Sequence, residues 1–448
     1  MSPEPPPAGD RAAGHERGKA GQVNVLGIIA SGVAALFITV ALAKSARRVA
    51  LRPNVPDEPG GRAPRAEALR RTGGATAVLG VGTATGAALW LGAAGDAAGS
   101  VGGLLAGAGL VAVVGFVHDL KPLWAALRLA VQITAAVLVV CLAGFPPAAG
   151  VLAVLWIVLV THAFALLDHA DGLLTAVGLV TAAGLLTCAL LGKDPALALL
   201  PTALVAGLAG FLLHTWHPAR LRLGASGAQF TGFALAASGA LIQAAAPSGR
   251  AAWAALPALA TVALADSALV LISRRRAARS PLRETDDHIA HRLRRVRVTV
   301  PGAAVLTALW AAVPVATGTL VYAELLHPAF LLLPLAGTAA AVFALLRIPA
   351  YAPPRTAPPR RGSSRTVPSR TVSSGVTPSR TAAARSTGAS SAAAAIPAAA
   401  SAPGAKRPAT GRGAPAGAAR TAAGRPTVPP PPTGRPTAEA ATAAAERR

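Results

Sequence analysis

The sequence predicts an all-α fold: a polytopic membrane helix bundle of about eleven transmembrane helices, followed by a disordered C-terminal tail. Three observations predict it. Apolar runs of about 20 residues, the length that a helix needs to cross a bilayer, recur before residue 350. Only 13% of the residues are charged, about half the usual share in a soluble domain. Beyond residue 350 the large apolar residues almost disappear.

Each apolar run is taken as one membrane-spanning helix. The first run ends in "ALA" at 41–43, which resembles a signal-peptide cleavage site, but the run is longer than a signal peptide needs. A basic loop also follows it, so we expect a retained span. In chain order the predicted spans are 24–43, 75–94, 99–117, 124–144, 149–167, 172–191, 196–213, 228–246, 252–273, 299–321 and 327–347.

The distribution of Lys and Arg predicts the orientation in the cell membrane. Loop 44–73 carries eight of these residues and loop 274–298 carries nine, whereas the short alternate loops carry almost none. Basic loops stay on the cytoplasmic side of a membrane. We therefore expect the N-terminus outside the cell and the C-terminus inside.

Three segments follow from this pattern. Residues 1–22 form a short polar extracytoplasmic segment, 23–348 the membrane domain, and 349–448 a basic tail rich in Pro, Ala and Arg. Such a tail buries too little apolar surface to offset its ordering entropy, so we expect disorder. The net charge of +24 would suit a nucleic-acid binder, but the apolar runs exclude that class and indicate the lipid bilayer as partner.

Four polar clusters fall on the predicted cytoplasmic face, at 117–123, 168–173, 214–229 and 279–293. Ionisable groups at the ends of membrane helices are costly to bury and mark functional sites. Carboxylates beside basic side chains suit a divalent cation together with a phosphorylated substrate. The sequence therefore predicts one site at this face.

These clusters, in this order, resemble the motifs of the polyprenyl-phosphate phosphoglycosyl transferases called glycosyltransferase family 4. Its members include phospho-N-acetylmuramoyl-pentapeptide transferase and UDP-N-acetylglucosamine:undecaprenyl-phosphate N-acetylglucosamine-1-phosphate transferase. The resemblance covers about residues 24–347. The matching stretches are "RRTGG" (70–74), "HDLK" (118–121), "HAFALLDHADG" (162–172), "PA" (218–219) with "GASGA" (224–228), and "TDDHIAHRL" (285–293).

The resemblance implies transfer of a sugar-1-phosphate from a UDP-sugar to undecaprenyl or another polyprenyl phosphate, with release of UMP, in cell-envelope glycan synthesis. It also implies Mg²⁺ or Mn²⁺ as cofactor. Carried over by position, it gives Asp119, Asp168 and Asp171 as catalytic residues, and Asp168, Asp171 and His118 as metal ligands. The substrate-binding residues that it gives are Arg71, Lys121, Arg128, His288, His291 and Arg292.

The sequence departs from the family pattern in each cluster. His118 stands where the family has a carboxylate, and Ala225 stands where it has a metal-binding aspartate. Thr285 and Ala290 replace an acidic residue and a histidine in the last motif. Losing a direct ligand of the cation should cost most of the rate. A catalytically degenerate relative, a membrane scaffold that binds lipid or protein, is therefore the alternative to an active transferase.

Two further alternatives stay open. His118, His162 and His169 could hold a transition metal in place of Mg²⁺, because imidazole favours such metals. A transporter is disfavoured, because no pair of short, interrupted spans marks two inverted repeats. The alanine-rich spans permit close helix packing and hence a homodimer, but they do not require one.

Overall fold

The structure is a computed structural model, and its described residues contain helices and turns but no strand, which confirms the all-α class. All of them belong to one compact unit, Met1–Arg361. The predicted segment 1–22 and nearly all of 349–448 lie outside the described residues, so the three-segment division stays a prediction. The described residues are 24–50, 72–192, 194–246, 250–278 and 287–349.

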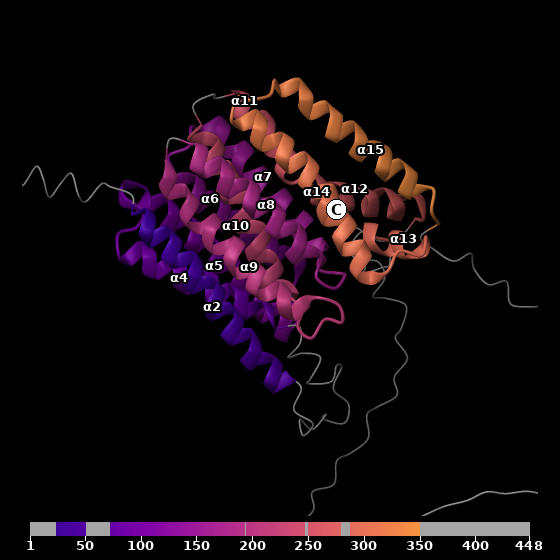
Figure 1. Ribbon diagram of the computed structural model, residues 1–448, viewed down its shortest axis with the longest axis horizontal. Helices are drawn as coiled ribbons and strands as arrows, with labels where there is room; N and C mark the ends of the chain where they lie inside the picture. The colour runs from indigo at the N-terminus through magenta and orange to yellow at the C-terminus, as the bar shows by residue number, and fades with distance from the viewer. Residues whose placement is uncertain (1–23, 51–71, 193, 247–249, 279–286, 350–448) are drawn as a thin grey trace, which may run out of the picture. The chain divides into compact units, whose positions relative to one another are not determined.

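Three of the described connections between helices contain a 3₁₀ turn: η1 (Gly95–Ala97), η2 (Pro195–Ala198) and η3 (Pro328–Leu331). The α-helices (Figure 1) are α2 (Val25–Ala50), α4 (Gly74–Trp90), α5 (Ala98–Leu120), α6 (Ala125–Leu142), α7 (Pro147–Leu166), α8 (Leu173–Leu191), α9 (Leu199–Thr215), α10 (Gly224–Ala244), α11 (Arg250–Leu259), α12 (Thr261–Arg276), α13 (Ile289–Arg295), α14 (Val300–Tyr322) and α15 (Leu332–Leu346).

Eight helical segments of the described chain are long and apolar enough to cross a membrane, and a bent pair makes up to nine. All eight coincide with predicted spans, so the multi-pass membrane class is confirmed. The count of eleven is not confirmed. The two remaining predicted spans are α4, which has 17 residues, and α10, which is rich in Gly, Ala and Ser. The orientation across the membrane stays a prediction.

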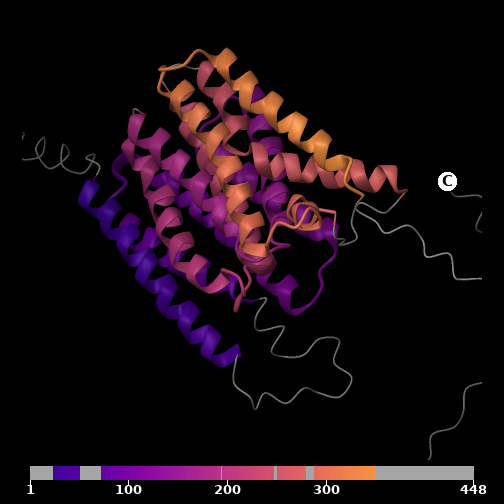
Figure 2. The same ribbon diagram turned by 45° about the vertical axis from the view of Figure 1, so that its right-hand side comes forward.

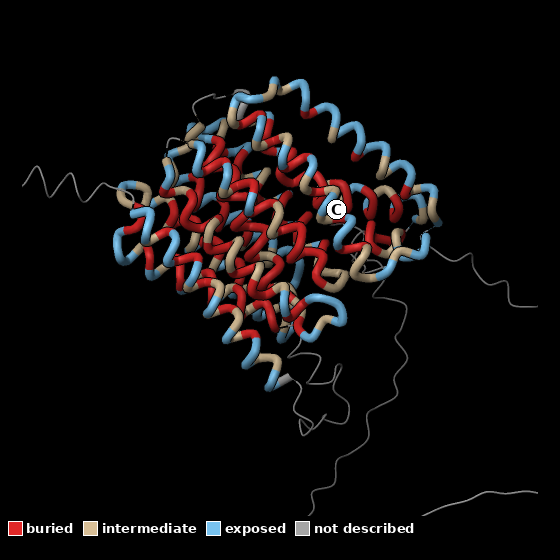
Figure 3. The backbone as a smooth tube through the Cα atoms, in the orientation of Figure 1, coloured by how far each residue is buried: buried red, intermediate tan, exposed pale blue. Residues whose placement is uncertain are grey.

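Helix α10 lies at the centre of the bundle. It packs against α4, α5, α7, α8, α9 and α11, and 17 of its 21 residues are buried. Figure 3 shows its tube almost wholly buried among helices whose outer faces are exposed. Because α10 meets other helices and not lipid, small residues that allow close backbone approach serve it better than large apolar ones.

The predicted span at 252–273 is not one straight helix. Helices α11 and α12 occupy this stretch and are bent by 64°. Pro257, inside α11, cannot donate a backbone hydrogen bond, which weakens the helix at this point. At the bend itself, the carbonyl of Leu259 accepts a hydrogen bond of 3.1 Å from the Thr181 hydroxyl of α8. Beyond the bend α12 packs against α15 (Figure 2) and α7.

Glycines allow neighbouring segments to approach the first turn of α10. A Cβ atom on Gly115 of α5 would lie 2.7 Å from the Ala225 carbonyl oxygen. A Cβ atom on Gly74, the last residue of the "RRTGG" stretch, would lie 1.9 Å from the Leu223 carbonyl oxygen. Both contacts are with backbone, which cannot rotate away. The two glycines are therefore required by packing.

Replacing Gly115 by Ala should lower the free energy of unfolding by about 1–3 kcal/mol, because the methyl group overpacks a backbone contact. The measurement is thermal unfolding in detergent. Gly109→Ala on the same helix is the matched control, because nothing lies within 4 Å of the added methyl group. Equal midpoints for the two variants would show that the close approach of α5 to α10 does not exist.

Candidate functional site

The first turn of α10 is held by a carboxylate from α5. Asp119, at the end of α5, accepts hydrogen bonds from the backbone N–H of Ala225 (2.8 Å, Oδ1) and of Ser226 (3.0 Å, Oδ2). The first N–H groups of a helix have no partner within the helix, and the helix dipole favours a negative charge there. Asp119 therefore caps α10 from a segment more than a hundred residues earlier.

Asp168, between α7 and α8, adds a second carboxylate at the same helix end. Its Oδ2 accepts a hydrogen bond of 2.9 Å from the Gly224 N–H, and its carbonyl oxygen accepts one from the Arg222 guanidinium. Burial raises the pKa of Asp168 to about 7, although the Arg222 charge opposes this rise. Asp119 and Asp168 thus meet at three consecutive N–H groups.

Asp171 points to the connection between α9 and α10. Its Oδ2 lies 2.8 Å from Nδ1 of His217 and accepts a hydrogen bond of 3.2 Å from the Ala219 N–H. Its side chain is 30% exposed, so this carboxylate is oriented but remains accessible. Gly172, with φ of +70°, makes the turn into α8. The turn holds Asp171 beside the site.

Of the other predicted residues near these carboxylates in the sequence, His118, Lys121 and Arg128 lie in the described structure. Nδ1 of His118 accepts a hydrogen bond of 2.9 Å from the Leu123 N–H, so His118 closes the turn after α5. Lys121 is exposed in that turn. Arg128 of α6 is partly buried, and its Nε has no hydrogen-bond partner in the described structure. Arg71 lies outside the described residues.

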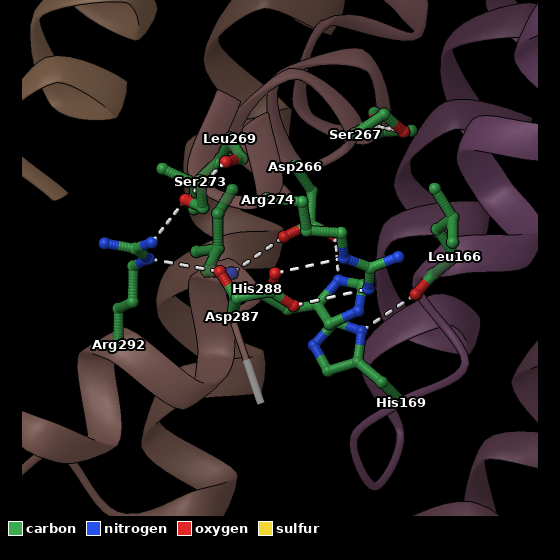
Figure 4. A network of polar contacts seen from close by, with 12 residues as sticks. Leu166, His169, Asp266, Ser267, Leu269, Ser273, Arg274, Asp287, His288 and Arg292 are labelled. Atoms are coloured by element: carbon green, nitrogen blue, oxygen red, sulfur yellow. Dashed lines mark hydrogen bonds and ion pairs between the residues drawn. The ribbon is translucent and has the colours of Figure 1, made fainter. Parts of the chain in front are cut away.

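Three histidines and a buried aspartate form a second group, and Figure 4 shows two of these histidines, His169 and His288, together with Asp266. The rings of His169 and His288 are stacked, with centroids 3.8 Å apart, and His291 lies 5.1 Å from His169. Nδ1 of His288 lies 2.8 Å from Oδ2 of Asp266 on α12. Burial lowers the pKa of His169 to about 3, so this imidazole is neutral at neutral pH. The structure thus joins the second and fourth sequence clusters.

Arg292 is 2% exposed and binds protein groups on several sides. One guanidinium nitrogen donates to the carbonyl oxygens of Leu345 (2.7 Å) and Ile348 (2.6 Å), at the end of α15. Another donates to the Ser273 hydroxyl of α12, and Nε donates to the Asp287 carbonyl at 3.1 Å. Arg292 ties α12, α13 and α15 together. It would have to leave these partners to meet a substrate.

Comparison with known proteins places this site in a family. The model of glycosyl transferase family 4 matches residues 101–243, a range that contains the three aspartates. A protein of Streptomyces coelicolor named as a glycosyltransferase is 39% identical over 332 residues, which are 72% of this chain and 77% of the relative. The chain belongs to glycosyl transferase family 4.

A second relative, from Bacillus subtilis, is named as an undecaprenyl-phosphate N-acetylglucosaminyl 1-phosphate transferase. It is 23% identical over 234 residues, which are 46% of this chain and 61% of the relative. The resemblance stated from the sequence motifs is therefore confirmed at the level of the family. The roles of individual residues stay predictions.

The carboxylates do not fit the hard-cation site that the family resemblance implies. Mg²⁺ is held by carboxylate and other oxygen donors. Ala225 brings no such donor, and the oxygens of Asp119 and Asp168 face backbone N–H groups. Within the described ranges, the one group of three His, Cys, Asp or Glu donors close enough for a common ion is a different one. The Mg²⁺ or Mn²⁺ requirement stays a prediction.

Two residues of the site were not predicted from the sequence. Asp266 was passed over as part of a span, although a lone carboxylate in an apolar run is itself a signal of function. His217 lies in the polar cluster 214–229, but the sequence gives it no role of its own. Its contact with Asp171, 46 residues earlier, has no signature in the sequence.

Replacing Asp119 by Ala should lower the free energy of unfolding by about 2 kcal/mol, because two helix N–H groups lose their acceptor. Asp119→Asn should cost less, since the amide oxygen can still accept. Thermal unfolding in detergent measures both. Asp96→Ala, on the exposed turn before α5, is the control. An Asp119→Ala midpoint equal to that of the control would refute the capping role.

Replacing Arg292 by Lys should lower the free energy of unfolding by about 2–3 kcal/mol, because an ammonium cannot reach acceptors on several sides at once. Arg294→Lys, on the exposed face of α13, should change it little. The measurement is again the unfolding midpoint. If Arg292 instead binds substrate, the Arg292→Lys variant will keep its midpoint and show a raised KM.

Proposed function

We propose that this protein transfers a sugar-1-phosphate from a UDP-sugar to a polyprenyl phosphate in the membrane and releases UMP. One observation carries the proposal. Asp119, Asp168 and Asp171, which match family motifs in separate parts of the sequence, converge at the α9–α10 connection and the first turn of α10. The names of the two relatives agree with this chemistry.

The reaction joins two anions. An oxygen of the lipid phosphate attacks the phosphorus that carries the sugar, the bond to the UMP oxygen breaks, and UMP leaves with that electron pair. Positive groups must offset the repulsion and the charge that develops during transfer. Arg128 suits this role, because its side chain is partly buried and its buried Nε lacks a hydrogen-bond partner in the described structure. Lys121, exposed in the neighbouring turn, is the second cation.

The remaining roles follow from accessibility. Asp171, oriented by His217 and the Ala219 N–H and still partly exposed, is the carboxylate placed to contact a bound substrate. Asp119 and Asp168 act through α10, because their oxygens hold its first turn. His291, half-buried beside His169, is the histidine of the last motif with most access to a sugar nucleotide. Which sugar is transferred is left to experiment.

The second candidate function is a degenerate family member that binds lipid or a partner without turnover. Ala225 favours it, because a donor expected in the family is missing. The capping contacts of Asp119 and Asp168 favour it too, since they give both carboxylates a structural task. In this case polyprenyl phosphate would bind and no UMP would appear.

The test is UMP release by the purified full-length chain in detergent with undecaprenyl phosphate, UDP-N-acetylglucosamine and, separately, Mg²⁺, Mn²⁺ or Zn²⁺. We expect turnover that Asp171→Asn reduces at least about 100-fold. Asp96→Asn, whose residue lies away from the site at the other end of α5, should match the wild type. Both variants should unfold at the wild-type temperature.

No UMP with any metal, and with a panel of other UDP-sugars, would reject the transferase. Binding of labelled undecaprenyl phosphate under the same conditions would then establish the second candidate function. Turnover that Asp171→Asn leaves unchanged would instead keep the transferase but remove Asp171 from its site.

A further inference from the structure

His169, Asp266 and His288 come together from three separate segments (Figure 4). His169 lies between α7 and α8, Asp266 lies on α12, and His288 precedes α13. Each offers one donor atom, and these atoms lie within 4.8 Å of one another. Two imidazoles and one carboxylate form a common ligand set for Zn²⁺ and related transition metals.

His169 has the orientation that is usual for a metal-binding histidine, with one ring nitrogen donating to a carbonyl and the other offering a lone pair. Its Nδ1 lies 2.8 Å from the Leu166 carbonyl oxygen, and a carbonyl can only accept, so Nδ1 carries the hydrogen. The lone pair is therefore on Nε2. That atom is buried and has no hydrogen-bond partner in the described structure. Histidines that bind metals usually donate their other ring N–H to such a carbonyl.

Asp266 and His288 are held equally firmly. Asp266 is fully buried and His288 is 4% exposed. Oδ1 of Asp266 accepts a hydrogen bond of 2.7 Å from the Ile289 N–H, and Oδ2 lies 2.8 Å from Nδ1 of His288. A buried carboxylate beside two imidazoles offers a negative charge that a cation can neutralise.

We propose that His169, Asp266 and His288 bind one divalent transition-metal ion of the zinc class. The ion takes the place of the hydrogen between Asp266 and His288, and that hydrogen moves from Nδ1 to Nε2 of the His288 ring, so that Nδ1 offers its lone pair to the ion. Metal–ligand bonds of about 2.0–2.2 Å draw the three donors closer together. The two rings must then tilt out of their stack. This proposal does not depend on the transferase reaction.

The site differs from both metal sites expected from the sequence. It contains none of the three carboxylates that the family resemblance implies. It shares only His169 with the alternative set of His118, His162 and His169. His118 is occupied by the turn after α5, and His162 is exposed on α7, where its Nδ1 lies 3.0 Å from the Val158 carbonyl oxygen.

The experiment measures zinc bound to the purified full-length chain, stripped with chelator and then dialysed against Zn²⁺ with a weak competing chelator. The wild type should retain about one Zn²⁺ per chain and gain thermal stability from it. His169→Phe keeps a flat ring against His288 but has no atom that can bind the metal. This variant should therefore lose both the bound zinc and the zinc-dependent rise in thermal stability. His162→Phe, the matched control, should keep both.

Zinc retained equally by wild type and His169→Phe would overturn the proposal, and so would a wild type that retains none. If His169→Phe fails to fold, X-ray absorption of the wild type with bound Co²⁺ decides: imidazole ligands support the site, and their absence overturns it. Zinc binding without UMP release would support this site and not the transferase. UMP release without zinc binding would do the reverse.

Discussion

The arrangement of the helices in this protein depends on which groups accept hydrogen bonds from the backbone N–H groups in the first turn of α10. The N–H groups of Gly224, Ala225 and Ser226 lie at the end of the central helix, where unpaired backbone groups are costly. The carboxylates of Asp119 and Asp168 accept from all three. Because Asp119 lies in the last turn of α5 and Asp168 follows α7, the same contacts fix the ends of two further helices. Gly74 and Gly115 leave the room that this meeting requires.

This capping has a consequence for the chemistry of the site. In a family whose activity is expected to need a metal held by carboxylates, two of the three aspartates here face helix N–H groups, and Ala225 adds no charge. The positive end of α10 takes the place next to these carboxylates that a cation would otherwise take. Asp171, which is partly exposed, and Lys121, which is exposed, are then the groups with most access to a substrate.

The histidine group depends on a different feature, the bend between α11 and α12. The 64° change of direction follows Pro257, and Thr181 binds the carbonyl at the bend. Beyond it, α12 carries Asp266 toward the segment that contains His288. A buried ion pair between Arg274 and Asp287, at 3.1 Å, and the contacts of Arg292 hold that segment in place. The last motif therefore contains the proposed metal ligand His288 and, through Arg292, holds the end of α15.

The sequence by itself determined the helical membrane class, the position of almost every helix and the family, because hydropathy and motif order are local properties of the chain. It also placed Asp119, Asp168 and Asp171 in polar clusters beside apolar runs, and the family resemblance gave these residues a predicted catalytic role. Only the tertiary structure decided that α10 lies at the centre, that the span at 252–273 bends, and that Asp266 and His217 join the site. These features depend on which distant groups satisfy a backbone N–H, a carbonyl or a buried charge, and no local pattern records such partners.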